Sequence, residues 1–336
     1  MSDSAIKSKP AQATKAADWQ PDEVGAQGGA TLRSFFPDKP LWTPEIDRKA
    51  AMVAEWMACD LAGAHIWGVQ RTGKSEFAKY LLDVIPTMLE GSAVAIMWNF
   101  LGLKPKNADQ LLKRCLVDMG CNTISARETL VLQARLVALV GQRCQAVSAR
   151  RVLIIVDEMQ NIPHELYPVL MSVTADLMKL RLVPHLLSIG QPEMQTTIDL
   201  VFQGNYLQMI GRFFQRTEVY CGLTSQDIRE LLSNMEGTDR EFTRQHFPGR
   251  AAEGWSIVDL AVPMEQAVSA MLAGKNIAGA RVRLPLGYLR PALNFMFRQL
   301  ADDLEAIVDR AVALSCFKFT GLHKVIGHYV EYPNER

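Results

Sequence analysis

The chain has 336 residues, which is enough for one large domain or for two domains with a sizeable core. Its apolar fraction of 49% and charged fraction of 21% are typical of a globular protein. The 36 basic side chains equal the 36 acidic side chains in number, which excludes a globally basic nucleic-acid-binding protein and leaves only a local patch or repeated copies of the chain for such contacts.

The cysteines and the chain's hydrophobicity indicate an intracellular setting. The six cysteines form no Cys-x-x-Cys pair, which predicts reduced thiols and no zinc site. Residues 1–15 are polar and lack the apolar core of a secretory signal. No apolar run is long enough to cross a bilayer. We therefore expect a cytoplasmic protein with no membrane contact.

The N-terminal region predicts an arm followed by a helix. Residues 1–30 are rich in Ala, Ser, Lys, Gln and Gly, a composition that buries too little surface to order by itself. The predicted arm either stays flexible or orders against a partner. Residues 44–60 carry apolar side chains at helical spacing, so residues 1–45 form the arm and a lead-in to the first strand.

Residues 68–75 have the spacing of a phosphate-binding P-loop, a glycine followed by four residues and then Gly-Lys-Ser. The two glycines allow backbone N–H groups to approach phosphate oxygens closely. Lys74 would reach the β- and γ-phosphates, and Ser75 would offer its hydroxyl to Mg²⁺. The predicted nucleotide-binding residues here are Gly68, Val69, Gln70, Arg71, Thr72, Gly73, Lys74, Ser75 and Glu76.

The segments that flank this loop occur in the order that a P-loop needs. Residues 64–67 are apolar and predict a buried strand. Residues 76–84 predict a helix whose positive N-terminal end would face an anion. The alternative is an ordinary strand-to-helix turn.

The middle of the chain predicts further strands and helices in alternation. Strands are predicted at residues 93–98 and 185–190, and a loop is predicted at residues 103–109. The predicted helices cover residues 110–119, 123–148 and 171–180.

Two acidic residues follow the most apolar strand. Residues 152–156 form a continuous β-branched run, as a central parallel strand should. The run ends in Asp157 and Glu158, at the strand tip where ligands bind in open α/β sheets. Asp157 would support Mg²⁺ through water, and Glu158 would orient or deprotonate the attacking water. Two surface acids are the alternative.

A polar residue closes the next strand. Gln191 could contact the γ-phosphate or the attacking water, with Ser188 as the second choice and a simple turn residue as the alternative. A fifth strand is predicted at residues 217–220. From Thr224 onward the chain is mainly helical, with Thr224 or Ser225 as the first cap.

The C-terminal third predicts helices interrupted by one polar insertion. The insertion covers residues 237–254, and one long helix is predicted at residues 286–314. The segment from residue 317 onward is mixed in character and predicts no element.

The motifs, taken in order, resemble those of the AAA+ ATPases. The resemblance rests on the P-loop, the Asp-Glu strand tip, Gln191, the Gly-Arg-Phe stretch from Gly211 and the Gly-x-Leu-Arg helix start. It implies an α/β P-loop AAA+ fold with a central parallel sheet and a smaller C-terminal helical lid domain. The implied divisions are a nucleotide-binding domain at residues 46–223, a lid at 224–315 and a tail at 316–336.

The same resemblance implies roles for single residues. Arg212, with Arg216 as a substitute, would be an arginine finger that stabilises charge on the nucleotide of a neighbouring copy. Arg290 would bind nucleotide from the lid as sensor 2, and Gln191 lies near sensor 1. The implied catalytic residues are Glu158, Asp157, Lys74, Gln191 and Arg212, and the implied metal ligands are Ser75 and Asp157. Solvated or structural arginines are the alternative for both arginines.

Within the AAA+ ATPases, residues 68–75, 157–161 and 189–193 make the chain similar to the transposition regulators TnsC, TniB, IstB and MuB, and most of all to TnsC and TniB. The resemblance implies a slow regulatory ATPase that uses ATP and Mg²⁺ and assembles on duplex DNA as a ring or helical filament. The implied partners are a transposase and a target-site selector protein, and the implied location is the nucleoid. The alternatives are an ATPase of a secretion or signalling assembly resembling ExeA, and a replication loader or initiator.

Such a protein needs a surface that faces DNA. The best local candidate is the basic loop after the second strand, because lysines and hydroxyls suit phosphate contacts without reading sequence. The candidate residues are Lys104, Lys106, Asn107, Lys113, Thr123 and Arg127. One such loop on a neutral chain would bind weakly, and a row of copies would multiply the affinity. Solvated loop lysines are the alternative.

Overall fold

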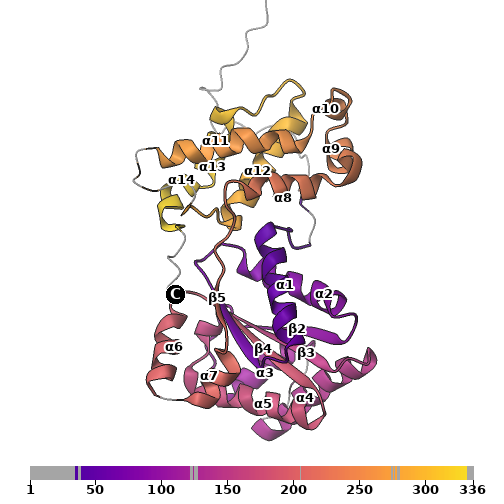
Figure 1. The fold of residues 1–336 in the computed structure, drawn as a ribbon, viewed down its shortest axis with the longest axis vertical. Coiled ribbons are helices and arrows are strands. Elements are labelled where there is room, and N and C mark those ends of the chain that lie inside the picture. The colour runs from indigo at the N-terminus through magenta and orange to yellow at the C-terminus, as the bar shows by residue number, and fades with distance from the viewer. Residues whose placement is uncertain are drawn as a thin grey trace, which may run out of the picture.

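The computed structural model divides the chain into an α/β part and a helical part (Figure 1). It describes residues 35–36, 39–121, 124, 128–204, 206–273, 275, 277 and 281–330. The predicted arm at residues 1–30 lies outside these ranges. Within them, no helix combines the length and the apolar character needed to cross a membrane.

The α/β part is built on one parallel sheet of five strands in the order β2-β3-β4-β1-β5. The strands are β1 (Gly63–Trp67), β2 (Ala93–Asn99), β3 (Arg151–Asp157), β4 (Val183–Gly190) and β5 (Thr217–Val219). All five lie where the sequence predicts strands. Because every pair is parallel, the carboxyl ends of β1, β3 and β4 meet at one edge, where the P-loop and both acidic residues follow.

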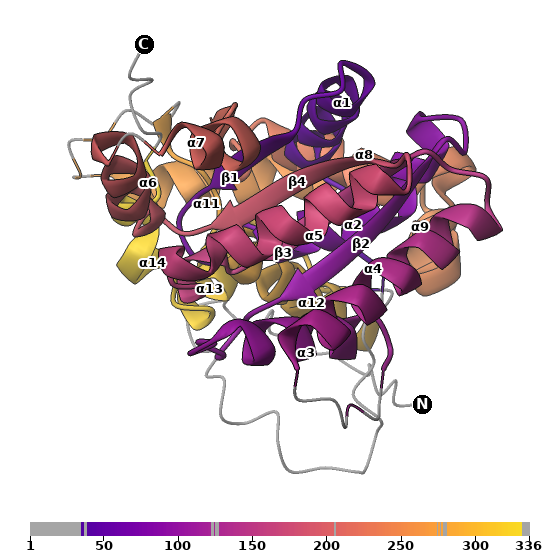
Figure 2. The same cartoon turned by 90° about the horizontal axis from the view of Figure 1, so that it is seen from below.

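Helices cover both faces of this sheet. They are α1 (Pro44–Ala58), α2 (Lys74–Met88), α3 (Ala108–Asp118), α4 (Thr129–Ala146), α5 (Tyr167–Lys179), α6 (Met194–Gln203) and α7 (Leu207–Phe213). Alternate side chains of β3 enter two separate cores, as strand geometry requires. Val152, Ile154 and Val156 pack with α3, α4 and α5 on the face turned to the viewer in Figure 2. Leu153 and Ile155 pack with α1 and α2.

The helical part has its own core. Its helices are α8 (Asp227–Glu236), α9 (Glu241–His246), α10 (Pro248–Ala252), α11 (Ala261–Leu272), α12 (Leu286–Asp302), α13 (Arg310–Phe319) and α14 (Leu322–Val325). Phe35 and Phe36 of the lead-in are buried in this core and not in the α/β part. The central parallel sheet and the helical C-terminal part confirm the expected fold class.

Two expectations for the helical part are wrong. The helix expected at residues 286–314 is two helices, because the chain leaves α12 at Asp303 and Asp309 starts α13 by accepting a hydrogen bond from the Val312 N–H at 2.9 Å. The polar insertion at residues 237–254 is not simply irregular, since it contains α9 and α10. Val330, in the segment with no expected element, pairs with Val282.

Candidate functional site

The P-loop is shaped by close backbone contacts. It connects β1 to α2, and Gly73 precedes α2 with a φ of 117°, which favours glycine. A Cβ atom on Gly68 would lie 2.3 Å from the carbonyl oxygen of Tyr220. Both glycines are therefore required by the local geometry that positions Lys74 and Ser75 at the helix N-terminus.

The Lys74 ammonium lies inside the loop. It donates to the carbonyl oxygens of Gly68 at 2.6 Å and Val69 at 2.8 Å, and the side chain is buried. Burial lowers the pKa of Lys74 to about 8, although Glu158, Asp157 and Glu193 act in the opposite direction. The amine therefore stays charged at neutral pH and can exchange loop carbonyls for phosphate oxygens.

Asp157 has the environment of a residue that supports a hard cation. It is 2% exposed, and its Oδ1 accepts the Glu158 N–H at 3.0 Å. Its Oδ2 is buried and makes no hydrogen bond of ordinary geometry to any described residue. Burial and Glu158 raise the pKa of Asp157, whereas Ser75 and Lys74 help to lower it. A buried carboxylate oxygen beside a serine hydroxyl fits Mg²⁺ and its water ligands.

Glu158 is held by two glutamines at the tip of β3. Its backbone has a φ of 59°, in the left-handed region that non-glycine residues seldom adopt. Gln191 donates from Nε2 to Glu158 Oε2 at 3.0 Å, and Gln160 donates to the same oxygen. Gln191 therefore lies at the predicted site. Ser188 does not, because strand alternation points it into the core, where it donates to the Ala64 carbonyl at 3.2 Å.

The helical part, predicted to be a lid, reaches the P-loop directly. Arg290 on α12 places Nη1 3.9 Å from Oε2 of Glu76, in the first turn of α2, and its guanidinium lies over the Phe36 ring. The N–H of Gly287 donates to the Arg71 carbonyl at 2.9 Å. The predicted sensor 2 arginine is thus next to the predicted nucleotide-binding residues.

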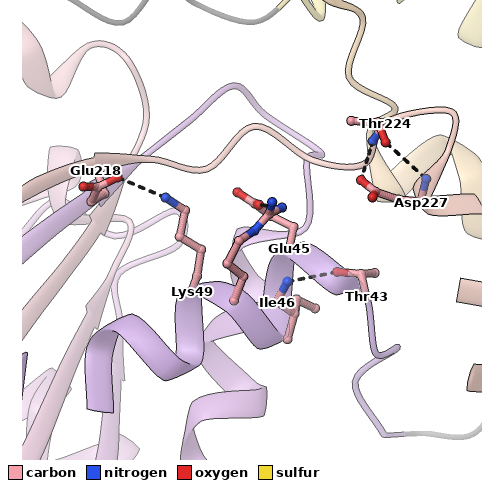
Figure 3. A network of polar contacts seen from close by, with 8 residues as sticks. Thr43, Glu45, Ile46, Lys49, Glu218, Thr224 and Asp227 are labelled. Atoms are coloured by element: carbon pink, nitrogen blue, oxygen red, sulfur yellow. Dashed lines mark hydrogen bonds and ion pairs between the residues drawn. The ribbon is translucent and has the colours of Figure 1, made fainter. Parts of the chain in front are cut away.

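Polar contacts lie on each side of the connection between the two parts (Figure 3). Lys49 of α1 donates to Glu218 of β5 at 3.1 Å. Thr224 and Asp227 exchange two hydrogen bonds just before α8, of 2.7 and 3.1 Å, whereas the residue at the N-cap position is Gln226 and not the expected Thr224 or Ser225. Burial raises the pKa of Glu45, which lies in the first turn of α1.

Arg212 lies away from the other predicted catalytic residues. It is near the amino end of β1, where a Cβ on Gly63 would be 1.9 Å from its carbonyl oxygen. Its Nη1 donates to the Thr174 hydroxyl at 3.1 Å, beside a cavity of about 130 Å³. Arg216 is exposed at the same edge. Because a finger acts on a neighbouring copy, this role stays a prediction for both arginines.

The predicted DNA-facing residues are only partly described. Lys104 and Lys106 are exposed on the loop after β2, and Lys113 is half-buried on α3. Asn107 is exposed, but its Oδ1 accepts the Gln110 N–H at 3.0 Å and so caps α3. Thr123 and Arg127 lie outside the described residues.

Comparison with known proteins finds similarity to solved structures. No family model and no curated protein sequence matches the chain. The Orc1 protein of Aeropyrum pernix in complex with DNA is 14% identical, with a TM-score of 0.43 over 86% of this chain and 87% of that chain. Cdc6p from Pyrobaculum aerophilum is 13% identical, with a TM-score of 0.49 over 79% and 65%. A Walker-type ATPase of Pyrococcus abyssi is 13% identical, with a TM-score of 0.48 over 88% and 78%. Similarity at this level concerns the fold and assigns no activity.

Sequence reasoning did not assign side-chain roles to three residues near the site. Gln70 was expected to bind phosphate only as part of the loop, yet its side chain donates to Gln191 Oε1 at 2.8 Å. Gln160 lies in the stretch 157–161, but no role was predicted for its side chain. Tyr329 donates to the Gln70 carbonyl at 3.1 Å across 259 positions, and no local sequence pattern signals so distant a contact.

Proposed function

We propose that this protein binds ATP with Mg²⁺ and hydrolyses it at the carboxyl edge of the sheet. The observation that carries the proposal is the convergence of Lys74, Asp157 and Glu158 there, with Arg290 of the helical part against Glu76 in the first turn of α2. Lys74 would bind the phosphates, and Arg290 would add positive charge from the lid. Glu158 would accept a proton from the attacking water, which Gln191 helps to orient.

Bound Mg²⁺ would neutralise charge that develops on the phosphates. Ser75 and Asp157 would hold the ion, the latter through water. Asp157 is suited to this because its buried Oδ2 makes no hydrogen bond of ordinary geometry to any described residue.

The central test separates binding from hydrolysis. Lys74→Ala should abolish ATP binding in calorimetry, because it removes the charge that the loop directs at the phosphates. Glu158→Gln should keep ATP affinity within about threefold and slow phosphate release about 100-fold or more, on the scale of a lost general base.

Lys179→Ala is a matched control, because this lysine on α5 is exposed and pairs with Asp176 far along the chain from the P-loop. It should leave both quantities unchanged. Tight ATP binding by Lys74→Ala would contradict the proposal.

We further propose that copies of the chain assemble on duplex DNA in an ATP-dependent manner and regulate transposition, linking a target-site selector protein to a transposase. The transposition role rests on the resemblance to TnsC and TniB. DNA binding is supported by the exposed Lys104 and Lys106, which emerge from β2 next to the site. The hydrogen bond from the Phe100 N–H to the Asp157 carbonyl, at 3.2 Å, joins the start of that loop to the acidic strand tip.

Charge reversal tests this surface. Lys104→Glu with Lys106→Glu should weaken DNA binding by about tenfold or more at low salt, since phosphate contacts give affinity through counterion release. Electron microscopy with duplex DNA and a non-hydrolysable ATP analogue should show rings or filaments for the wild type.

Lys318→Glu with Lys324→Glu, a basic pair on the helical part, provides the control. Equal loss of binding in both pairs would indicate a general charge effect and not a contact at the loop. A chain that stays monomeric with ATP and DNA would refute the assembly.

A further inference from the structure

Gln70 is a P-loop residue that contacts two other segments at once. Its side-chain Nε2 donates to Gln191 Oε1 at 2.8 Å, and its backbone carbonyl accepts the Tyr329 hydroxyl at 3.1 Å. Gln191 follows β4, and Tyr329 lies close to the C-terminal end of the described chain. Gln70 of the phosphate loop thus connects Tyr329 of the C-terminal segment to Gln191, which follows β4.

The same path continues to the predicted base. Gln191 uses its amide oxygen to accept from Gln70 and its amide nitrogen to donate to Glu158 Oε2 at 3.0 Å. Gln160 donates to that carboxylate oxygen, and its own Oε1 accepts the Gln191 N–H at 3.3 Å. Two amide donors on Oε2 fix the orientation of the carboxylate, so the group cannot turn toward an attacking water until one of these hydrogen bonds breaks.

Tyr329 is itself fixed to the lid. Its carbonyl accepts the Arg283 N–H at 2.8 Å, and the next residue, Val330, pairs with Val282. Its ring lies edge-on to Tyr288 at 6.2 Å, and the side chain is 7% exposed. The hydrogen bond from the Tyr329 hydroxyl to the Gln70 carbonyl therefore depends on the positions of the helical part and of the C-terminal segment.

We propose that residues 326–330 restrain Glu158 through Tyr329, Gln70 and Gln191, with Gln160 as a second positioning residue on the same carboxylate. This proposal rests on the proposed ATPase function. A movement of the lid or of this segment breaks the contact between Tyr329 and Gln70. Gln191 is then free to leave Glu158, and hydrolysis is released.

Steady-state kinetics test the restraint. Gln160→Met removes one donor from Glu158 and should raise the basal kcat about fivefold, the size expected for one lost hydrogen bond. Gln70→Met and Tyr329→Phe act from further away and should raise kcat about threefold. KM should stay within about twofold in all three, whereas damage to the phosphate loop would raise KM.

Gln195→Met is the matched control. Gln195 is an exposed glutamine on α6 whose Nε2 donates to Asp199 at 2.9 Å, so it loses a similar bond outside the path. It should leave kcat unchanged. An unchanged or lower kcat in Gln160→Met and Gln70→Met, with ATP still bound, overturns the restraint and leaves the proposed function intact.

A double-mutant cycle tests whether the path runs through Gln70. Tyr329→Phe should add nothing to kcat in a Gln70→Met chain, because the connection is already broken there. Independent effects that multiply would overturn the path. Failure of the wild type to bind or hydrolyse ATP would instead overturn the proposed function.

Hydrogen exchange provides a readout that needs no turnover. The Gln191 N–H is bonded to Gln160. Tyr329→Phe should therefore speed exchange of the Gln191 amide several-fold at a distance, while the amides of α6 beyond Gln195 keep their rates. An unchanged exchange rate of the Gln191 amide would show that residues 326–330 do not act on Gln191.

Discussion

Single buried polar side chains affect how the stability of this fold depends on pH. His65 is an example outside the site. It lies in β1 with no exposed surface, and its Nδ1 shares a hydrogen bond with the Ser188 hydroxyl at 2.8 Å. Its Nε2 has no hydrogen-bond partner among the residues that the structure describes. Burial lowers the pKa of His65 to about 4, so the folded protein keeps this imidazole neutral.

The pKa of His65 predicts a pH dependence of stability. As pH falls below the ordinary histidine value of about 6.5, the unfolded chain binds a proton that the folded chain refuses, so the free energy of unfolding decreases. Between pH 7 and pH 5 the loss from this group should be about 2 kcal/mol.

Urea unfolding of the wild type and of His65→Gln at both pH values measures this loss. The glutamine can keep a bond to Ser188 and does not titrate, so its pH slope should be shallower by that amount. Other titrating groups, His185 included, cancel in the difference. Parallel slopes would show that His65 is not the cause.

At the scale of elements, the break between α12 and α13 is held from outside. Arg250 of α10 is 8% exposed and donates to the carbonyl oxygens of Leu300 at 3.2 Å, Asp303 at 2.7 Å and Ala306 at 2.8 Å. Its guanidinium also lies 5.6 Å from the Trp255 ring centre. One side chain thus satisfies carbonyls that the end of α12 leaves without helical partners.

Arg250→Met should therefore destabilise the protein by about 3 kcal/mol, because several buried carbonyls lose a charged donor together. Chemical denaturation measures the change. Arg244→Met, on the exposed surface of α9, should cost less than about 0.5 kcal/mol. Equal effects of the two substitutions would mean that the carbonyl contacts contribute little.

At the scale of the whole molecule, the segment before α1 ties the two parts together. Phe35 is 4% exposed in the core of the helical part, with its ring 5.6 Å from Phe247 and 5.7 Å from Phe297. The chain then crosses to α1, which packs on the sheet. The helical part therefore depends on residues that lie nearly two hundred positions before it in the sequence.

Phe35→Ala should lower the stability of the helical part by about 3 kcal/mol through loss of burial and packing. Faster hydrogen exchange in α11, with the exchange of β3 little changed, would locate the effect. Phe319→Ala is the control, because Phe319 is 54% exposed and stacks on Phe295 at the surface. A uniform loss of protection would indicate that the two parts unfold as one unit.

Local patterns predicted the strands and the P-loop, and distant contacts limited the rest. Four of the five strands are short, mainly apolar runs, and Lys74, Ser75, Asp157 and Glu158 follow two of them in fixed order, so local pattern and spacing were sufficient there. The single helix expected at residues 286–314 failed because Leu304 and Ile307 continue the helical spacing, although they are 69% and 79% exposed in the connecting loop.

Partners far along the chain were beyond prediction. Nothing in the sequence near Arg212 indicates that it bonds to Thr174, and nothing near Gln70 indicates Tyr329. Helix α6 was also missed, because the residues that follow Gln191 were given no element. The contacts of Arg212 and Gln70 depend on how distant segments of the chain are arranged in space, and no local sequence pattern predicts that arrangement.

The contact between Gly68 and Tyr220 has a practical consequence for preparing an inactive form. Any larger residue at position 68 would press on the backbone where β5 leads toward the helical part, since a Cβ there would lie 2.3 Å from the Tyr220 oxygen. A defect seen with such a substitution would combine two effects, the loss of nucleotide binding and the displacement of the segment that connects β5 to the helical part. Lys74→Ala removes the ammonium and leaves the contact between Gly68 and the Tyr220 backbone unchanged. It is therefore the better inactive form for work in cells.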